Sequence, residues 1–302
     1  MKVLVIGHQG MLARELLPCL GSAGFAVESR GRPEVDITQA TSVRQTLAEV
    51  QPDILINAAA YTAVDQAESE PEVAFAVNRD GVAYLATACR NINIPLLHIS
   101  TDYVFDGSAS RPYCEHDRTV PLGVYGQSKW EGEEAVRCVH PEHVMVRTAW
   151  LYGFHRHNFV KTMLRLARER EVLRVVDDQY GCPTWSRDLA RALMTICQRI
   201  VQDRDRVPWG TYHFCGAGQT TWHGFARTII EEARTYEQLR VQEVVPIPTT
   251  AYPTPAKRPA YSVLECSKVQ SVFGITPCPW RESLHNCLQE FYTCTSTLLA
   301  MS

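Results

Sequence analysis

At 302 residues the chain can form one large α/β domain, or one domain with a smaller lobe. The net charge is −3 and Lys and Arg form no run, which argues against a nucleic-acid partner. The sequence has no 18 consecutive apolar residues, and its N-terminal apolar run is too short for a signal peptide, which argues against a membrane partner. Eleven scattered cysteines without C-x-x-C spacing indicate reduced thiols in the cytoplasm, rather than a disulfide framework or a zinc site.

Short β-branched runs alternate with helix-length segments through the first half of the chain. The predicted buried strands span residues 3–6, 53–56, 95–99 and 144–147, and residues 24–29 are predicted to form another short strand. The predicted helices span residues 11–23, 41–50, 72–91 and 127–139. This alternation is typical of an α/β fold with a Rossmann-type doubly wound parallel sheet, so we expect residues 1–152 to form a dinucleotide-binding domain.

The alternation weakens after residue 152. A helix over 158–170, a short strand over 173–176 and helices over 186–200 and 222–234 follow. The stretch 244–260 has five prolines, which predicts an extended surface loop. We expect residues 153–302 to form mainly a smaller α/β substrate-binding lobe that closes over the carboxyl edge of the sheet, with some segments returning to the first domain.

A glycine-containing run, GHQGMLA, follows the first predicted strand and begins the first predicted helix. Gly7 allows a tight turn, Gly10 lets a pyrophosphate approach the backbone, and the small residue at position 13 lets helix and strand pack closely. This arrangement favours a dinucleotide, and Met11 and Leu12 join the two glycines as candidate cofactor contacts.

Ligands of doubly wound sheets bind outside the carboxyl ends of the strands, so the residues that follow each strand are candidates. One predicted strand is followed by Ala58, Ala59 and Ala60, whose minimal side chains let a cofactor lie against the main chain. The next two are followed by residues 100–105, which include hydroxyl groups, and by residues 147–153, in which a tryptophan either packs in the core or stacks on a ring.

Tyr125 and Lys129 stand four residues apart on one predicted helix and therefore share a face. Alone, the pair is compatible with an ordinary amphipathic surface helix. The pair indicates an active site only together with Thr101, which ends a strand of the same predicted sheet. A free phenol has a pKa of about 10, too high for efficient proton transfer at neutral pH, and a nearby cation lowers it.

The set of Thr101, Tyr125 and Lys129 resembles the active site of the short-chain dehydrogenase/reductase superfamily. Motifs spread from residue 7 to residue 268 resemble, in order, those of one extended branch, the dTDP-4-dehydrorhamnose reductase family: NAAAYTAVDQAE, STDYVFDG, YGQSKWEGE, RTAWLYG, DDQYGCPTW, YHFCGAGQTTWHGFA and KRPAYSVLECSK. The resemblance implies NAD(P)H-dependent reduction of the 4-keto group of dTDP-4-dehydro-β-L-rhamnose to dTDP-β-L-rhamnose, in nucleotide-sugar biosynthesis for cell-surface polysaccharide.

The resemblance also assigns roles to single residues. Tyr125 would be the proton donor, Lys129 its electrostatic partner and a ligand of the cofactor ribose, and Thr101 a hydrogen-bond partner of the substrate carbonyl. Positions that match the family's substrate contacts are Asp102, Tyr103 and Trp150. Positions that match the cofactor's walls are Asp36, Ile37 and residues 58–60, although Asp36 would also suit the cap of the following helix.

Cofactor choice depends on residues that follow the second predicted strand. An acidic residue there would favour NADH, whereas arginine accommodates the 2′-phosphate of NADPH. Glu28 lies inside the strand and Arg30 follows it. We therefore predict that NADPH is preferred and NADH is also used, with Arg30 as the phosphate ligand.

The diphosphate of a sugar nucleotide needs a cationic partner in a chain of net negative charge. Arg258 stands near the end of the proline-rich stretch, and the planar fork of arginine suits phosphate oxygens. We predict that Arg258 binds the diphosphate. The alternative is a solvated basic pair with Lys257 on a surface loop.

No metal is predicted. Some members of the family bind magnesium between subunits through glutamates, but Arg187 stands where the resemblance implies one of those carboxylates. His155 and His157 have no nearby Cys or carboxylate in the sequence and suit a solvated loop.

Two other functions stay open. The family also includes the β subunit of methionine adenosyltransferase, a non-enzymatic regulatory subunit that keeps the nucleotide site, and a reductase of a related nucleotide 4-keto sugar would share the same motifs. The intact set of Thr101, Tyr125 and Lys129 favours an enzyme. The oligomeric state is also open, with a homodimer as one alternative.

Overall fold

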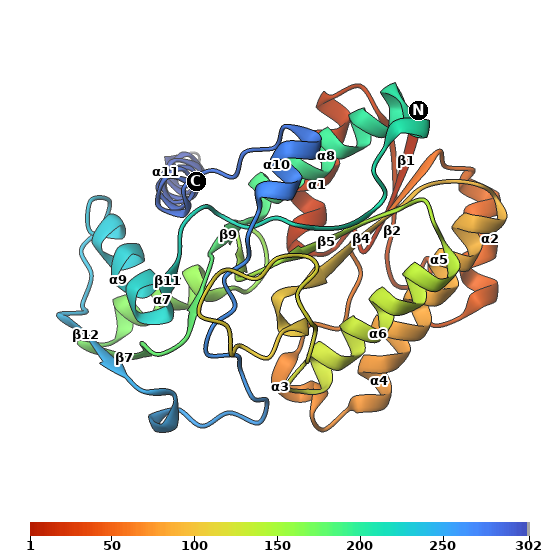
Figure 1. Ribbon diagram of the computed structural model, residues 1–302. Helices are drawn as coiled ribbons and strands as arrows, with labels where there is room; N and C mark the ends of the chain where they lie inside the picture. The colour runs from red at the N-terminus through yellow and green to blue at the C-terminus, as the bar shows by residue number, and fades with distance from the viewer. Residues whose placement is uncertain (301–302) are drawn as a thin grey trace.

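The computed structural model describes the backbone of residues 1–300 and the side chains of residues 1–293. Six parallel strands form its main sheet in the order β10-β5-β4-β3-β1-β2, which confirms the predicted doubly wound architecture (Figure 1). The strands are β1 (Lys2–Ile6), β2 (Ala26–Arg30), β3 (Ile54–Asn57), β4 (Leu96–Thr101), β5 (His143–Thr148) and β10 (Gly210–His213). The strand order reverses between β1 and β3, so a ligand-binding crevice is expected at their carboxyl ends.

Helices cover both faces of this sheet (Figure 1). Because successive side chains of a strand point to opposite faces, Val3 and Val5 pack into one core cluster and Leu4 and Ile6 into another. The first cluster lies under α1 (Met11–Ser22) and α8 (Ser186–Gln202), and the second under α2 (Ala40–Val50), α5 (Gly81–Asn91) and α6 (Val124–Val139). Burial on both faces explains why the strands read as continuous apolar runs.

The predicted helix over 72–91 is interrupted. It consists of α4 (Pro71–Phe75), a π-helical turn (Ala76–Asp80) and α5. Within the turn, Asn78 accepts a hydrogen bond from the backbone N–H of Tyr61 at 2.9 Å and donates one to the hydroxyl of Ser128 on α6 at 3.0 Å. The wider turn therefore ties the loop after β3 to the helix that contains Tyr125 and Lys129.

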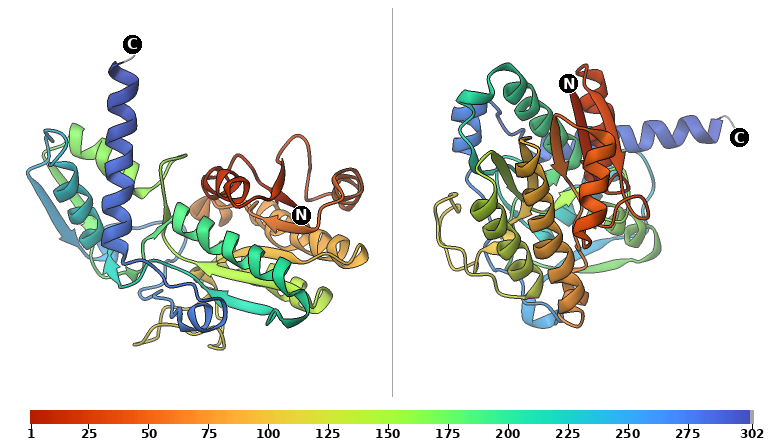
Figure 2. Two further views of the ribbon diagram at one scale, coloured as in Figure 1. Left: turned by 90° about the horizontal axis from the view of Figure 1, so that it is seen from above. Right: turned by 90° about the vertical axis from the view of Figure 1, so that its right-hand side faces the viewer.

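The smaller lobe contains α7 (Phe159–Glu169), β7 (Val172–Val176), α9 (Trp222–Ala233), β12 (Glu243–Ile247) and α11 (Trp280–Ala300). Short two-stranded pairs complete it: β7 with β12, β8 (Tyr180–Gly181) with β11 (Thr220–Thr221), and β6 (Leu151–Tyr152) with β9 (Thr184–Trp185). Buried aliphatic residues together with aromatic ones, including Phe225 and Trp280, form its core. Figure 2 shows α11 extending from this lobe away from the rest of the molecule.

The prediction of an extended loop over 244–260 is wrong in its first part, because residues 244–247 belong to β12. Pro246 is tolerated there since a two-stranded sheet has only edge strands, where a missing N–H is not costly. β10 was not predicted; it pairs with β5 and, together with α8, returns the chain to the main sheet. No helix in the described part of the chain is long and apolar enough to cross a membrane.

Candidate active site

One cavity of about 1110 Å³ opens at the carboxyl edge of the main sheet. Ligand sites commonly measure about 300–1000 Å³, so this one has room for a dinucleotide beside a second ligand. Most of the predicted site residues line it: Gly7, Gly10, Met11, Leu12, Ile37, Ala58, Ala59, Ala60, Thr101, Asp102, Tyr103, Tyr125, Lys129 and Trp150. Residues predicted from separate motifs therefore face one space.

The turn between β1 and α1 requires glycine at its first position. Gly7 has a φ of +94°, and a Cβ there would lie 2.7 Å from the backbone nitrogen of Ala59. The N–H of Gly7 donates to the carbonyl of Arg30 at 2.7 Å, and the N–H of Gly10 donates to the carbonyl of Gly7 at 2.9 Å. These bonds use the N–H groups of Gly7 and Gly10, so a pyrophosphate would meet the N–H groups that follow them at the N-terminus of α1.

Thr101 ends β4, while Tyr125 and Lys129 lie in the first turns of α6. The hydroxyl of Thr101 donates to Oδ1 of Asp102 at 3.1 Å, and Nζ of Lys129 donates to the carbonyl of Ile99 at 2.7 Å. All three side chains line the cavity. These contacts with β4 hold the threonine and the lysine in place before any ligand binds.

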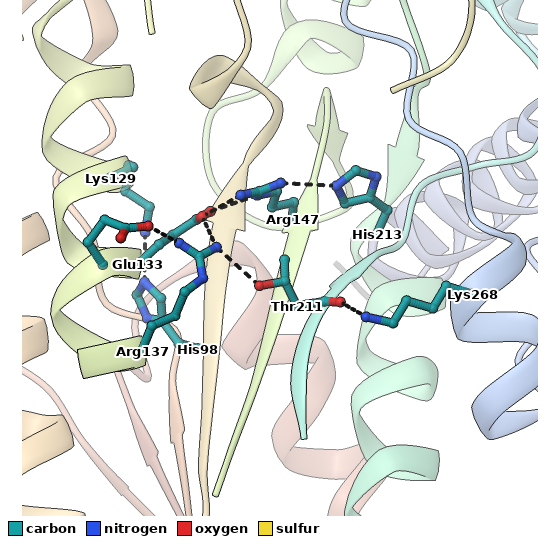
Figure 3. Close-up of polar contacts among 9 residues, drawn as sticks. His98, Lys129, Glu133, Arg137, Arg147, Thr211, His213 and Lys268 are labelled. Carbon is teal, nitrogen blue, oxygen red and sulfur yellow. Dashed lines mark hydrogen bonds and ion pairs between the residues drawn. The ribbon is translucent and has the colours of Figure 1, made fainter. Parts of the chain in front are cut away.

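The charge of Lys129 is not balanced by a free carboxylate. Burial lowers the pKa of Lys129 to about 8, and Glu133, one turn further along α6, acts in the opposite direction. The two oxygens of Glu133 accept hydrogen bonds from Arg147 at 2.9 and 2.6 Å, and one also accepts from Arg137 at 2.7 Å (Figure 3). Because two guanidinium groups share this carboxylate, it attracts the ammonium only weakly.

The two acids nearest to Thr101 are both shifted toward their protonated forms. Burial raises the pKa of Tyr125 to about 12, opposite to the lowering expected from a nearby cation, and raises that of Asp102 to about 6. Oδ2 of Asp102 is buried and has no hydrogen-bond partner in the described part of the chain. The site therefore holds a neutral phenol and, beside Thr101, a buried carboxyl group whose pKa is raised.

Trp150 follows β5 in a left-handed backbone conformation, with a φ of +45°. Its indole stacks on Trp222 of α9, with 3.5 Å between the ring centroids and 6° between the planes. Gly181 lies against the ring, and a Cβ there would be 2.3 Å from Cε2 of Trp150. The stack joins the main sheet to the smaller lobe at the cavity wall. Trp222 was not predicted as a site residue, because a tryptophan at the start of a helix is compatible with an ordinary place in the hydrophobic core.

Three predicted residues do not line the cavity: Arg30, Asp36 and Arg258. The guanidinium of Arg30 donates to Glu28 at 3.1 Å. Oδ1 of Asp36 accepts from the N–H and the hydroxyl of Thr38 at 3.0 and 2.7 Å, so this carboxylate closes the turn before α2. Its hydrogen bonds explain why the pKa of Asp36 is lowered.

Arg258 forms a bidentate ion pair with Asp65 of α3 (Val64–Ala67), at 3.0 and 2.8 Å. Its guanidinium also donates to the hydroxyl of Thr254 at 2.6 Å. The hydrogen bonds between the two charged groups raise the pKa of Arg258 and lower that of Asp65. The predicted phosphate ligand is thus bound by a carboxylate, and the pair fastens the proline-rich segment to α3.

Three further residues with basic side chains line the cavity and were not predicted as ligands: Arg32, Arg156 and His157. Arg32 follows β2, and its Nη2 lies 3.6 Å from the carboxylate of Asp36. Arg156 adopts a φ of +62° in the loop before α7. The sequence signal for Arg32 was present in the run SRGR, whereas Arg156 and His157 read as part of a solvated loop.

The surroundings of Arg187 do not fit a divalent cation. Nε of Arg187 donates to Glu15 at 2.9 Å, and the same guanidinium pairs with Glu290 of α11. One side-chain cation therefore already pairs with both carboxylates. No three His, Cys, Asp or Glu side chains within the described residues group in a way that could hold a metal ion.

Comparison with known proteins agrees with this arrangement. The family described as the RmlD substrate binding domain matches residues 1–293. The dTDP-4-dehydrorhamnose reductase of Sinorhizobium fredii is 44% identical over 285 residues, 94% of this chain and 95% of that protein.

Solved structures agree as well. A dTDP-4-dehydrorhamnose reductase from Clostridium acetobutylicum superposes with a TM-score of 0.88 at 37% identity, covering 96% of this chain and 99% of that one. The one from Bacillus anthracis, in complex with NADP, has a TM-score of 0.87 at 35% identity with the same coverage. The chain therefore belongs to the dTDP-4-dehydrorhamnose reductase family, an extended branch of the short-chain dehydrogenase/reductase superfamily.

Proposed function

We propose that this chain reduces the 4-keto group of dTDP-4-dehydro-β-L-rhamnose to give dTDP-β-L-rhamnose, preferring NADPH and also using NADH. The observation that supports this most is the shared cavity of Thr101, Tyr125 and Lys129 and the open backbone turn at Gly7. Family membership supports the substrate. The NADP in the Bacillus anthracis relative supports the cofactor.

The proposed roles follow from the chemistry of each side chain. NADPH, when bound, supplies the hydride that the carbonyl carbon accepts. Tyr125 donates its proton to the carbonyl oxygen, to which Thr101 also donates a hydrogen bond after its hydroxyl has turned away from Asp102. Lys129 binds the cofactor ribose and stabilises the negative charge that develops on the phenol oxygen. Most of the gain comes from holding the reacting atoms in position.

The remaining cavity residues divide between two ligands. Residues proposed to contact the cofactor are Gly7, Gly10, Met11, Leu12, Ile37 and Ala58 to Ala60, with Asp36 shaping the turn behind them. Residues proposed to contact the sugar are Asp102, Tyr103 and Trp150. The carboxyl group of Asp102 suits a sugar hydroxyl, since its buried Oδ2 has no hydrogen-bond partner in the described part of the chain.

For the 2′-phosphate of NADPH we favour Arg32 over Arg30, because Arg32 lines the cavity and Arg30 does not, and because the carboxylate beside Arg32 is farther away, at 3.6 Å against 3.1 Å for Arg30. The two arginines form a matched pair for mutation. Arg32→Ala should raise the Michaelis constant for NADPH about tenfold and leave that for NADH unchanged, since only NADPH has this phosphate. An effect confined to Arg30→Ala would return the role to Arg30.

The activity is tested by adding the sugar nucleotide and NADPH to the purified chain and following NADPH oxidation. Oxidation confined to another nucleotide 4-keto sugar would favour a related reductase. Tight NADPH binding without any oxidation would favour a regulatory subunit. Sedimentation analysis of the same sample checks the homodimer, which stays a prediction.

Two further proposals concern where the protein acts in the cell and how the chain divides into two parts. We place the reaction in the cytoplasm, supported by free thiols on all ten cysteines of the described side chains. We also keep the division into a dinucleotide-binding part, residues 1–152, and a substrate lobe, residues 153–302. The whole chain is used to test it, because α8 and β10 complete the main sheet; substitutions in the second part should change the Michaelis constant of the sugar nucleotide and leave that of NADPH unchanged.

A further inference from the structure

A row of buried polar side chains, Asn57 and His98, leads to Lys129, and none of the roles proposed above uses it. Asn57 at the end of β3 is 1% exposed and His98 in β4 is 0% exposed. Nδ2 of Asn57 lies 3.1 Å from Nδ1 of His98, and Nε2 of His98 lies 3.5 Å from Nζ of Lys129. Figure 3 shows the His98 ring and the Lys129 side chain pointing toward each other.

The backbone N–H of Ala59, in the wall of the proposed cofactor site, fixes the direction of the hydrogen bonds in this row. The N–H of Ala59 donates to Oδ1 of Asn57 at 3.1 Å, so the amide must turn its Nδ2 toward His98. An amide nitrogen can only donate, and Nδ1 of His98 is therefore an acceptor. Burial and the nearby Lys129 both lower the pKa of His98 well below its usual value, so the ring is neutral. Its one proton is on Nε2.

The Nε2–H group of His98 consequently faces Nζ of Lys129. An ammonium has only hydrogens to offer and meets another donor there, whereas a neutral amine has a lone pair that can accept. Nζ keeps its hydrogen bond to the carbonyl of Ile99 in either form. The contact with His98 therefore disfavours the charged form of Lys129.

Among the described residues, Glu133 is the group that acts against this effect on Lys129. The titratable and charged groups that face them are Tyr125 and Glu133 of α6 with Arg137, Asp102 after β4, and His143 and Arg147 of β5. The phenol is neutral, and Glu133 is shared by two arginines. Burial also lowers the pKa of His143 and keeps that ring neutral.

We propose that Asn57 and His98 are positioning residues that lower the proton affinity of Lys129 by presenting it with a hydrogen-bond donor. The inference rests on the proposed function, in which Lys129 acts with Tyr125. An ammonium of ordinary proton affinity, with a pKa of about 10.4, keeps its proton throughout the neutral range. The tuned group exchanges its proton near neutral pH, which suits a site where Tyr125 must regain a proton after each turnover.

The tautomer of His98 is the first test. Nitrogen-15 NMR of protein labelled at histidine distinguishes Nδ1–H from Nε2–H, and His98→Phe identifies the resonance. The expected result is a neutral Nε2–H ring from about pH 6 to pH 9. Asn57→Asp should convert the ring to the Nδ1–H form, because a carboxylate can only accept. A wild-type ring in the Nδ1–H form would overturn the proposal, even if the variants failed to fold.

The proton affinity of Lys129 is the second test, measured as the pH dependence of NADPH binding without any sugar. His98→Phe and Asn57→Asp should each move the alkaline loss of binding upward by about one pH unit, or about tenfold in proton affinity. His140→Phe is the control, because it removes a buried histidine whose contact is with the carbonyl of Ile94. It should leave the curve unmoved.

The outcomes separate the two proposals. An unmoved curve in folded His98→Phe would contradict the role of His98, whatever the enzyme reduces. A wild-type chain that binds NADPH with the expected pH dependence but reduces no nucleotide sugar would instead contradict the proposed function and leave the role of His98 standing.

Discussion

At the scale of single residues, Tyr125 is the group whose removal is most informative. Burial raises the pKa of its phenol to about 12, so it is protonated throughout the neutral range, as a proton donor must be. Tyr125→Phe removes one oxygen and should leave the fold intact. We expect turnover to fall by about 10² to 10⁴, with NADPH affinity nearly unchanged. Steady-state kinetics and a fluorescence titration measure both, and near-normal turnover would exclude the proposed role.

Lys129 predicts a pH dependence with a definite sign. Burial lowers its pKa to about 8, and the proposed role needs the ammonium. The specificity constant for NADPH, which reports on the free enzyme, should be constant below that pH and fall as pH rises through about 8. An ordinary lysine would place the fall near about pH 10. A profile that falls only there would show that burial does not shift this group in solution.

At the scale of secondary-structure elements, Gly181 in β8 sets the position of Trp150. Gly181→Ala places a methyl group 2.3 Å from the indole, which must move off Trp222. We expect a cost of about 1–3 kcal/mol in stability from overpacking, and a raised Michaelis constant for the sugar nucleotide. Circular dichroism should also lose the signal of the stacked indoles.

The matched control for Gly181→Ala is Gly21→Ala in α1. A Cβ at Gly21 has no atom within 4 Å, and alanine favours the helix. This variant should keep both Michaelis constants. If Gly181→Ala behaved like Gly21→Ala, the Trp150–Trp222 stack would have no part in substrate binding.

The ion pair between Arg258 and Asp65 joins the proline-rich segment to α3. Arg258→Ala should raise the Michaelis constant of the sugar nucleotide about tenfold, equivalent to about 1.4 kcal/mol, and leave that of NADPH nearly unchanged. Asp65→Ala separates two reasons for this. If Arg258 binds the diphosphate directly, Asp65→Ala frees the arginine and should lower the Michaelis constant of the sugar nucleotide or leave it unchanged. If the ion pair only fastens the proline-rich segment, Asp65→Ala should raise that constant as Arg258→Ala does.

Helices and strands were predicted correctly where residues close together in the sequence determine them, and were missed where contacts between distant residues do. Strands buried on both faces read as apolar runs, so residues 3–6 and 144–147 fall inside β1 and β5. β10 is a four-residue edge strand, GTYH, without such a run, and it was missed. The π-helical turn within 72–91 is supported by the contact of Asn78 with Ser128, 50 residues away, which no local pattern records.

At the scale of the whole molecule, motifs predicted the contents of the cavity well, because parallel strands bring their carboxyl ends to one edge. The exceptions are side chains with competing partners. Spacing alone does not tell which arginine of SRGR reaches the cavity, since Glu28 binds the first. Nor does it show that Arg258 meets Asp65, 193 residues away. Such pairings depend on the folded chain and become visible only in the structure.

The central claim is hydride transfer to C4 of the sugar with proton donation by Tyr125, and isotope transfer tests it most directly. The purified chain is incubated with dTDP-4-dehydro-β-L-rhamnose and NADPH deuterated at the transferable position of C4, and the product is examined by NMR. We predict dTDP-β-L-rhamnose with deuterium at C4 of the sugar, and almost none from Tyr125→Phe in the same time. Deuterium retained in the nicotinamide, or product formed equally fast by Tyr125→Phe, would contradict the claim.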